Sequence, residues 1–227
     1  MLLNDSEVKF GKGNFIIMNK KIGIVGGAGF LGSRLADRLE TKNADYVIFD
    51  VDDSDINTVR ADVRDLASLS PLGECDVLVN LAAVHRDDIK PISLYDDVNV
   101  LGAQNICSVA RRHNIRKIIF TSSVAVYGFA KANTSEDGEH NYFNDYGRTK
   151  HLAEKVFKEW FDEDPEERML FIVRPTVIFG EGNRGNVYNL LNQIFRRQFV
   201  MIGNGRNIKS MAYVENIAAF LQYGIEF

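Results

Sequence analysis

Tyr146 and Lys150 are the two residues of this sequence whose types and spacing most directly suggest chemistry. They begin and end the segment Tyr146-Gly-Arg-Thr-Lys150. Residues four apart on a helix share one face, so the phenol and the ammonium would point to one place. An ammonium beside a phenol favours the phenolate and lowers the phenol pKa, which makes the tyrosine a general base. Ordinary surface pairs have the same spacing, so the pair needs support from elsewhere in the chain.

Hydroxyl side chains supply part of that support. The run Thr121-Ser122-Ser123 begins at the last residue of a predicted strand, 117–121. The carboxyl ends of parallel strands form the edge of a sheet at which ligands bind. A helix-capping role for Ser122 is the alternative.

A glycine-rich segment, Gly26-Gly-Ala-Gly29-Phe-Leu-Gly32, lies between a predicted strand and a predicted helix. There, backbone amides and a helix N-terminus can hold a pyrophosphate. Gly26 would allow the tight turn, Gly29 the close approach of phosphate, and Gly32 the packing of helix on sheet. Asp50 ends the next predicted strand, where a carboxylate can accept hydrogen bonds from ribose hydroxyls and would repel a 2′-phosphate. Because the glycine turn contains no arginine, the sequence predicts NAD rather than NADP.

These residues need a scaffold, and the hydrophobic pattern predicts alternating strands and helices. Strands are expected at 22–25, 46–49, 77–81, 117–121 and 170–173, and helices at 30–42, 98–113 and 146–161. The strands are apolar on both faces, which is typical of a parallel sheet covered by helices on each side. Right-handed crossovers then give an α/β fold with a doubly wound, Rossmann-type parallel sheet.

The composition fits an ordered globular chain. It has 227 residues, of which 45% are hydrophobic and 26% charged, and a net charge of −4. This balance argues against a nucleic-acid partner or an anionic membrane surface, and no apolar run reaches the roughly 18–20 residues of a membrane span. Cys75 and Cys107 fall in elements predicted to be buried, which favours a reducing, cytoplasmic setting. The four histidines are scattered along the sequence, so no metal site is predicted.

Together these motifs resemble the extended short-chain dehydrogenase/reductases of the nucleotide-sugar epimerase/dehydratase family, from about Lys21 to the end of the chain. Three further segments carry the resemblance: 62–65 is similar to an adenine-contacting segment, 80–83 to a wall of the cofactor site, and 121–128 to the active-site serine strand. Arg174-Pro175 begins the segment that follows. The resemblance gives as cofactor-binding residues Gly26, Gly29, Phe30, Leu31, Gly32, Asp50, Asp62, Val63, Leu81, Ala82, Ala83, Asn99, Ser122, Tyr146, Lys150 and Pro175.

The resemblance implies NAD-dependent chemistry on a sugar carried by a nucleotide diphosphate. The catalytic residues would be Ser123, Tyr146 and Lys150. Tyr146 would take a proton from a sugar hydroxyl while the hydride on that carbon passes to NAD, with Ser123 bonded to the same oxygen. Lys150 would lower the pKa of the tyrosine and bind the nicotinamide ribose. In an epimerase the keto-sugar then turns over and takes the hydride back, with C4 as the expected carbon.

Other outcomes of the same chemistry are weighed against this one. Val124 and Ala125 occupy the places where the family's 4,6-dehydratases carry the acid residues of the elimination, so that reaction is disfavoured. A sugar decarboxylase or reductase stays as an alternative, as does a non-catalytic NAD-binding sensor. A sensor would need none of Ser123, Tyr146 and Lys150.

The resemblance also implies how the chain is divided. Substrate contacts would come from Ser123, Asn186, Val187, Arg206 and Lys209. Lys209 stands where many relatives have a diphosphate-binding arginine, which keeps the charge but loses the two-pronged geometry.

Residues 18–175 are expected to form the NAD-binding domain. Residues 176–227 would begin a substrate-binding region, interleaved with that domain and truncated, since such enzymes are usually longer. Residues 1–17 would be a tail, either foreign to the natural protein or a genuine extension. A homodimer through helices 98–113 and 146–161 is implied as well.

Overall fold

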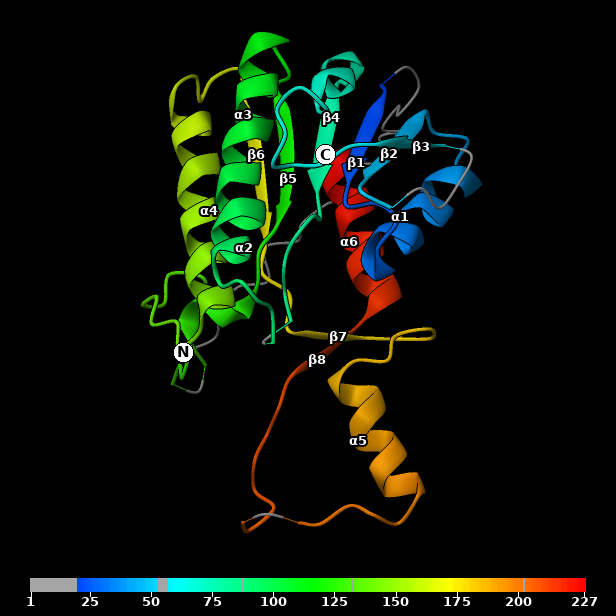
Figure 1. The fold of residues 1–227 in the computed structure, drawn as a ribbon, viewed down its shortest axis with the longest axis vertical. Helices are drawn as coiled ribbons and strands as arrows, with labels where there is room; N and C mark the ends of the chain where they lie inside the picture. Colours follow the sequence, from blue (N-terminus) through cyan, green and yellow to red (C-terminus); the bar gives the residue numbers. More distant parts are fainter. Residues whose placement is uncertain (1–19, 53–56, 87, 132, 202) are drawn as a thin grey trace, which may run out of the picture.

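Strands and helices alternate along the chain in the computed structural model, which describes residues 20–52, 57–86, 88–131, 133–201 and 203–227 (Figure 1). The expected tail, 1–17, lies outside the described residues. Six parallel strands form one sheet in the order β3-β2-β1-β4-β5-β6. Their bounds are β1 Ile22–Val25, β2 Tyr46–Asp50, β3 Thr58–Arg60, β4 Val77–Asn80, β5 Lys117–Thr121 and β6 Met169–Val173. The doubly wound parallel sheet predicted from the hydrophobic pattern is confirmed.

The order of the strands decides where a ligand can bind. The chain builds the sheet outward from β1 through β2 to β3, then returns to the other side of β1 and adds β4, β5 and β6. Such a reversal opens a crevice at the carboxyl ends of the two central strands. The glycine-rich segment follows β1 directly, so it lies at this crevice.

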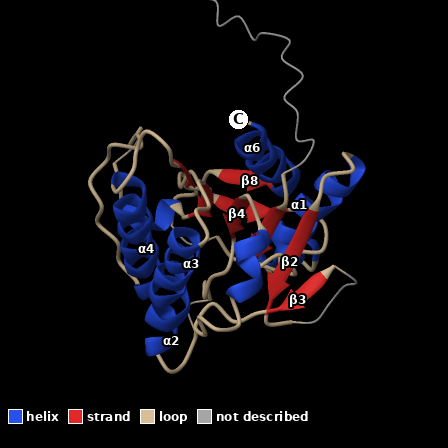
Figure 2. Ribbon diagram, turned by 90° about the horizontal axis from the view of Figure 1, so that it is seen from above, coloured by secondary structure: helices blue, strands red, loops and turns tan. Residues whose placement is uncertain are grey.

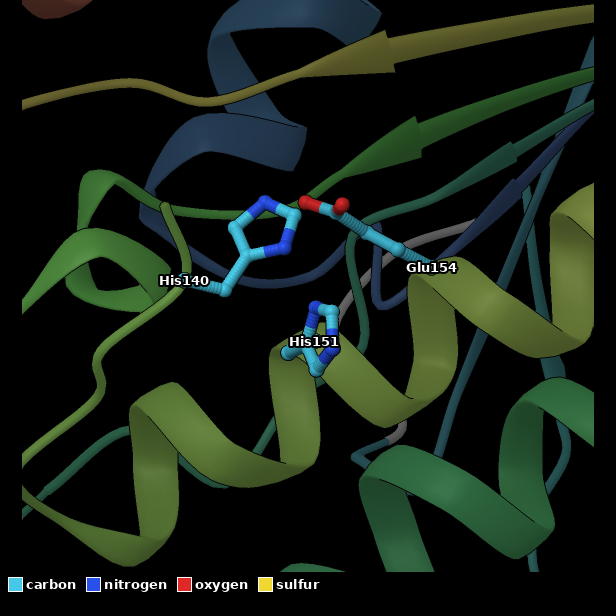
Figure 3. Close-up of side chains that lie close together, drawn as sticks. All are labelled: His140, His151 and Glu154. Atoms are coloured by element: carbon cyan, nitrogen blue, oxygen red, sulfur yellow. The ribbon is translucent and has the colours of Figure 1, made fainter. Parts of the chain in front are cut away.

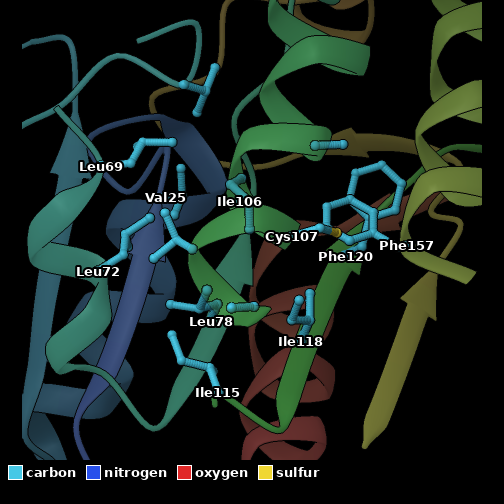
Figure 4. Close-up of a cluster of buried hydrophobic side chains, with 14 of the residues drawn as sticks. Val25, Leu69, Leu72, Leu78, Ile106, Cys107, Ile115, Ile118, Phe120 and Phe157 are labelled. Carbon is cyan, nitrogen blue, oxygen red and sulfur yellow. The ribbon is translucent and has the colours of Figure 1, made fainter. Parts of the chain in front are cut away.

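Helices cover both faces of the sheet (Figures 1 and 2). One face packs against α3 (Gly102–Arg112) and α4 (Asp145–Asp162), with Ile106, Phe157 and Trp160 fully buried (Figure 4). The other face packs against α1 (Phe30–Thr41) and α6 (Val214–Glu226). Successive residues of a strand point to opposite faces: in β5, Ile118 and Phe120 enter the first core and Ile119 the second. This alternation is why the strands are apolar throughout.

The ends of the two long helices differ in how they are built. The segment predicted as one helix, 98–113, is a π-helical turn, η2 (Asp96–Leu101), that continues into α3. α4 begins at an N-cap, Asn144, whose side-chain oxygen accepts the Gly147 N–H at 2.9 Å. This cap fixes the turn that carries Tyr146.

The remaining elements are short. Between the strands lie η1 (Ser70–Glu74), α2 (Ser93–Tyr95) and η3 (Val124–Tyr127). After β6 come β7 (Val177–Phe179), α5 (Asn186–Phe195) and β8 (Met211–Tyr213); β7 and β8 form a separate parallel pair. The chain then returns to the main sheet through α6, which packs on α1. No helix in the described part of the chain is long and apolar enough to cross a membrane.

Candidate active site

The glycine turn between β1 and α1 brings backbone, rather than side chains, to the crevice. Gly26 has φ +78°, and a Cβ there would lie 2.5 Å from the backbone nitrogen of Ala82, beyond the end of β4. A Cβ on Gly32 would lie 2.5 Å from the Gly27 Cα, so this glycine lets the helix approach the turn. Gly29 is the N-cap of α1 and supplies no side-chain cap, and the first turn of α1 has no acidic residue. The backbone N–H groups of the first turn of α1 therefore have no side-chain cap and no carboxylate in that turn. N–H groups at a helix N-terminus can bind a pyrophosphate.

Asp50 ends β2 beside this turn. Its carboxylate accepts the Ala28 N–H at 3.0 Å and the Asp52 N–H at 3.2 Å. A carboxylate has lone pairs for further hydrogen bonds, so Asp50 can also receive two ribose hydroxyls. These residues fit the adenosine end of NAD.

The predicted adenine-contacting segment splits between surface and core. The Asp62 carboxylate is bonded by both arms of Arg64, at 2.9 and 2.5 Å, and burial of the carboxyl is outweighed by this arginine, so its pKa lies below the ordinary range. The Val63 side chain is buried against Gly102, and its carbonyl accepts the Asn105 side chain at 2.8 Å. Because the Val63 side chain is part of the core, it does not face the crevice.

Leu81, Ala82 and Ala83 leave β4 at the crevice, as the sequence predicts. Leu81 N–H bonds the Val25 carbonyl at 2.8 Å, which holds this segment against β1. Asn99, which is buried on η2, holds the far end of this segment, because its amide oxygen accepts the Val84 N–H at 2.8 Å. The same amide donates to the Thr149 hydroxyl at 2.9 Å, one residue before Lys150. Asn99 therefore ties the segment after β4 to α4.

Ser123 and Tyr146 meet at the carboxyl edge of β5. The Tyr146 hydroxyl lies beside the Ser123 side chain, close enough for the two hydroxyls to interact. The Ser123 oxygen also accepts the Ala125 N–H at 3.1 Å, which fixes its orientation. Burial raises the pKa of Tyr146, and the Ser123 hydroxyl offsets part of that rise. The serine and the tyrosine that the sequence selected are thus brought together by the fold.

Lys150 lies on the same helix, and the structure gives it a contact that the sequence did not predict. It is 2% exposed, and its ammonium donates to the Thr121 carbonyl at 2.7 Å and lies 4.7 Å from the centre of the Phe120 ring. Burial lowers the pKa of Lys150 to about 7. In this arrangement the ammonium does not lower the Tyr146 pKa, because its hydrogen bond goes to the backbone of β5 instead.

A buried ion pair behind the site escaped sequence reasoning. Glu154 is 1% exposed, and its two oxygens accept hydrogen bonds from Arg174 at 2.8 and 2.6 Å. Arg174 also donates to the Tyr127 hydroxyl and to the Glu136 carbonyl. Burial alone would raise the Glu154 pKa, but the hydrogen bonds from Arg174 outweigh it and hold the pKa below its usual range. The available signal was spacing, because Tyr146, Lys150 and Glu154 follow at intervals of four on one helix face.

Two of the scattered histidines also meet at this ion pair (Figure 3). The ligand atoms of His140, His151 and Glu154 lie within 4.8 Å of one another. Burial lowers the pKa of both imidazoles, aided at His140 by Arg174 and at His151 by His140. Both Glu154 oxygens are engaged by the Arg174 cation, which opposes a second cation beside them. Sequence spacing does not indicate this cluster, because its members come together only in the fold.

The other predicted cofactor and substrate residues divide by position. Ser122 is buried at the end of β5, its N–H bonded to the Val173 carbonyl at 2.7 Å, and Pro175 accepts the Val124 N–H at 3.1 Å. Leu31 packs into the core beneath α1, and the Phe30 ring lies near Gly180. The proposed substrate residues other than Ser123 lie elsewhere: Asn186 and Val187 begin α5, and Arg206 and Lys209 lie on the exposed loop after it. That region extends away from the sheet in Figure 1.

A doubly wound sheet with a glycine turn at its central crevice, and with serine, tyrosine and lysine at one carboxyl edge, defines a dinucleotide-binding protein of the short-chain dehydrogenase/reductase type. Residues 22–226 match the NAD dependent epimerase/dehydratase family, and the chain belongs to that family. As a member it takes NAD as its cofactor, as the sequence predicts.

Curated relatives agree with this assignment, and a solved structure shares the fold. An Escherichia coli O157:H7 protein named N-acetyl-alpha-D-glucosaminyl-diphospho-ditrans,octacis-undecaprenol 4-epimerase is 49% identical over 92% of this chain and 64% of its own length. A putative UDP-glucose 4-epimerase of Methanocaldococcus jannaschii is 30% identical over 86% of this chain and 70% of that protein. The UDP-N-acetylglucosamine 4-epimerase structure from Bacillus cereus superposes with a TM-score of 0.80, at 20% identity, over 92% of this chain and 74% of that chain. The present chain thus spans less than two thirds of the E. coli relative.

Proposed function

We propose that the protein is an NAD-dependent 4-epimerase of a sugar carried on a diphosphate. The observation that carries the proposal is the placement of the Tyr146 hydroxyl beside the Ser123 side chain, at the sheet edge that also holds the glycine turn. A sensor of NAD would not need these hydroxyls together. The relatives named above support epimerisation at C4 rather than another outcome.

The chain's own residues divide the work between binding and proton transfer. When bound along the glycine turn and Asp50, NAD would supply oxidation and re-reduction of the sugar carbon. Tyr146 takes the proton of the sugar hydroxyl and later returns it. Ser123, held by the Ala125 N–H, donates to the same oxygen and steadies its developing charge. Before the sugar binds, the Ser123 hydroxyl offsets part of the rise that burial causes in the Tyr146 pKa. Once the sugar is bound, the single proton of this hydroxyl goes to the sugar oxygen.

Lys150 completes the site through its position rather than through a contact with the phenol. Its ammonium lies at the Thr121 carbonyl, one residue from Ser122, at the edge where the nicotinamide ribose would lie. With a pKa of about 7, it changes charge near neutral pH. We infer that Lys150 binds the ribose and favours the phenolate once it leaves the Thr121 carbonyl.

The proposal allows two carriers for the sugar. The sequence resemblance points to a nucleotide diphosphate, with Asn186, Val187, Arg206 and Lys209 as its contacts. The name of the E. coli relative gives a polyprenyl diphosphate instead. Both carriers share a diphosphate, which the cations of this region would bind. A 4,6-dehydratase remains disfavoured, because Val124 and Ala125 cannot move protons. A cytoplasmic location and a homodimer also remain proposals.

The experiment offers both carriers to the purified protein with NAD. UDP-N-acetylglucosamine and N-acetylglucosaminyl-diphospho-undecaprenol are incubated separately, and the released sugar is analysed for the C4 epimer. We expect conversion of at least one substrate, lost in Tyr146→Phe. If NAD binds tightly but neither sugar changes, in this chain or in any longer product of its gene, the sensor alternative replaces the epimerase.

A further inference from the structure

The buried ion pair of Glu154 and Arg174 joins the two segments that carry the Ser123 and Tyr146 hydroxyls. Glu154 lies on α4, about two turns after Tyr146, and Arg174 directly follows β6, the strand that pairs with β5. One guanidinium holds both Glu154 oxygens, at 2.8 and 2.6 Å. Such a two-pronged bond fixes direction as well as distance, so it holds α4 in one orientation against the end of β6.

The backbone on either side of Arg174 holds the backbone on either side of Ser123. The Ser122 N–H donates to the carbonyl of the residue before Arg174, at 2.7 Å. The Val124 N–H donates to the carbonyl of the residue after Arg174, at 3.1 Å. Ser123 lies between these two hydrogen bonds, so its backbone is held by the segment 173–175.

The remaining nitrogen of Arg174 extends this connection beyond Ser123. It donates to the Tyr127 hydroxyl and, at 2.8 Å, to the Glu136 carbonyl. Tyr127 is buried and ends η3, the turn whose N-cap is Ser123. The guanidinium therefore bonds the end of the serine turn with one nitrogen and α4 with the other two.

Direct packing between α4 and η3 is the alternative means of holding the two hydroxyls. A Cβ on Gly147 would lie 2.5 Å from the Ala125 carbonyl oxygen, so helix and turn touch beside Tyr146. Contact of this kind limits how closely the two segments approach. Hydrogen bonds between charged groups also fix their direction, which contact alone does not.

We propose that Glu154 and Arg174 are positioning residues that hold the Ser123 hydroxyl beside the Tyr146 hydroxyl for proton transfer. The proposal rests on the proposed function, in which these two hydroxyls share one sugar oxygen. Glu154 and Arg174 act only through the placement of the hydroxyls. Placement at this scale matters, because a displacement of about 1 Å can lower a rate by about a hundredfold.

Glu154→Gln tests the connection on the side of α4. The change keeps the size of the side chain but removes its charge and one of its two acceptor oxygens. We expect kcat to fall by about tenfold to a hundredfold, with the affinity for NAD unchanged. Crystal structures of the variant and the wild type should show the separation of the Ser123 and Tyr146 hydroxyl oxygens widened by about 0.5–1 Å.

Tyr127→Phe tests the connection on the side of η3. It removes one hydroxyl and keeps the ring, so the fold should tolerate it even if Glu154→Gln does not fold. We expect kcat and the separation of the two hydroxyl oxygens to change in the same direction but by less, because Arg174 keeps its bonds to Glu154. An unchanged separation in every folded variant of the two would overturn the proposal and leave direct packing as the device.

Two controls separate positioning from loss of stability and of charge. Leu72→Ala empties part of the core, because Leu72 is fully buried on η1 beside Gly23 of β1, and Glu163→Gln breaks an exposed ion pair at the C-cap of α4. Circular dichroism shows that each variant is folded at the assay temperature. Neither control should change kcat or the separation of the hydroxyl oxygens, and an equal fall of kcat in Leu72→Ala would overturn the proposal.

Failure of the proposed function gives a different result. If the wild type converts no sugar, the epimerase assignment fails, and the separation of the hydroxyl oxygens in the variants still decides whether the ion pair holds them. If the wild type is active and Glu154→Gln keeps its kcat, the epimerase assignment stands and the positioning role is wrong.

Discussion

Burial controls the chemistry of the side chains at the carboxyl edge of β5. Tyr146 is partly buried and Lys150 fully buried there, and burial favours the neutral form of each group. It raises the pKa of the Tyr146 phenol and lowers the pKa of the Lys150 ammonium to about 7. The Ser123 hydroxyl offsets part of the rise in the Tyr146 pKa, which favours the phenolate that a general base requires. At this scale, proton transfer depends on single hydroxyls.

Tyr146→Phe tests the proton acceptor. The change removes one hydroxyl and leaves the ring in place, so we expect the fold and the affinity for NAD to be retained. Turnover should fall by about two to four orders of magnitude, which is what a positioned acid–base group contributes. Steady-state kinetics and a fluorescence titration with NAD measure the two quantities. Near-normal turnover on a confirmed substrate would contradict the phenolate mechanism.

Glu154→Gln tests the buried ion pair behind the site. The change leaves the Arg174 cation, with its side chain 12% exposed, without its carboxylate, so we expect a loss of about 3 kcal/mol in the free energy of unfolding. Glu163→Gln is the matched control, because Glu163 also binds two arginines but its side chain is 41% exposed; it should cost less than about 1 kcal/mol. Urea unfolding measures both. Equal losses would mean that burial does not decide the effect.

His140 and His151 should make the protein less stable in weak acid. Their pKa values are lowered by burial, so below the ordinary value of 6.5 the unfolded chain binds more protons than the folded one. The free energy of unfolding therefore falls as the pH drops through 6.5. Urea unfolding at several pH values should show this slope, and His140→Asn with His151→Asn should flatten it. An unchanged slope in the double variant would assign the effect to other groups.

At the scale of elements, the turn between β1 and α1 separates packing from binding. Gly32 touches the backbone of Gly27, whereas a Cβ on Gly29 would meet only the Gly26 carbonyl, at 3.3 Å. Gly32 lets α1 approach the turn, and Gly29 leaves the N-terminus of α1 open. The two roles can be tested by the same substitution at both positions.

Gly32→Ala and Gly29→Ala should therefore have opposite profiles. We expect Gly32→Ala to lower the free energy of unfolding by about 1–3 kcal/mol through overpacking. Gly29→Ala should change the free energy of unfolding little but lower the affinity for NAD. The added methyl group would lie where the pyrophosphate approaches the helix N-terminus. Urea unfolding and NAD titration are run on both variants. If both lost only stability, the turn would be a structural corner rather than a cofactor site.

At the scale of the whole molecule, assembly is a prediction that the sequence resemblance made and that stays to be tested. Of the large apolar side chains exposed among the described residues, only Leu101, at 40%, lies in the two predicted interface segments, 98–113 and 146–161. A homodimer through these helices would therefore use mostly polar contacts. Light scattering at micromolar concentration should give twice the chain mass, and Gln104→Glu with Ser108→Glu, which adds like charges on α3, should restore the monomer. A monomeric wild type would contradict the prediction.

The sequence by itself determined the class of fold and predicted most of the proposed cofactor site. Both follow from local patterns: strands apolar on two faces, glycines between a strand and a helix, and an acid at the end of β2. The serine, tyrosine and lysine followed from motifs whose spacing is written along the chain.

Only the tertiary structure decided how those groups are held. Glu154 and Arg174 are 20 residues apart, and His140 and His151 belong to a loop and a helix, so no local pattern pairs them. The bond of Lys150 to the Thr121 carbonyl likewise depends on how α4 packs on β5. Burial, which shifts the pKa values of these groups, is a property of packing between distant segments, and the sequence records it only through the fold.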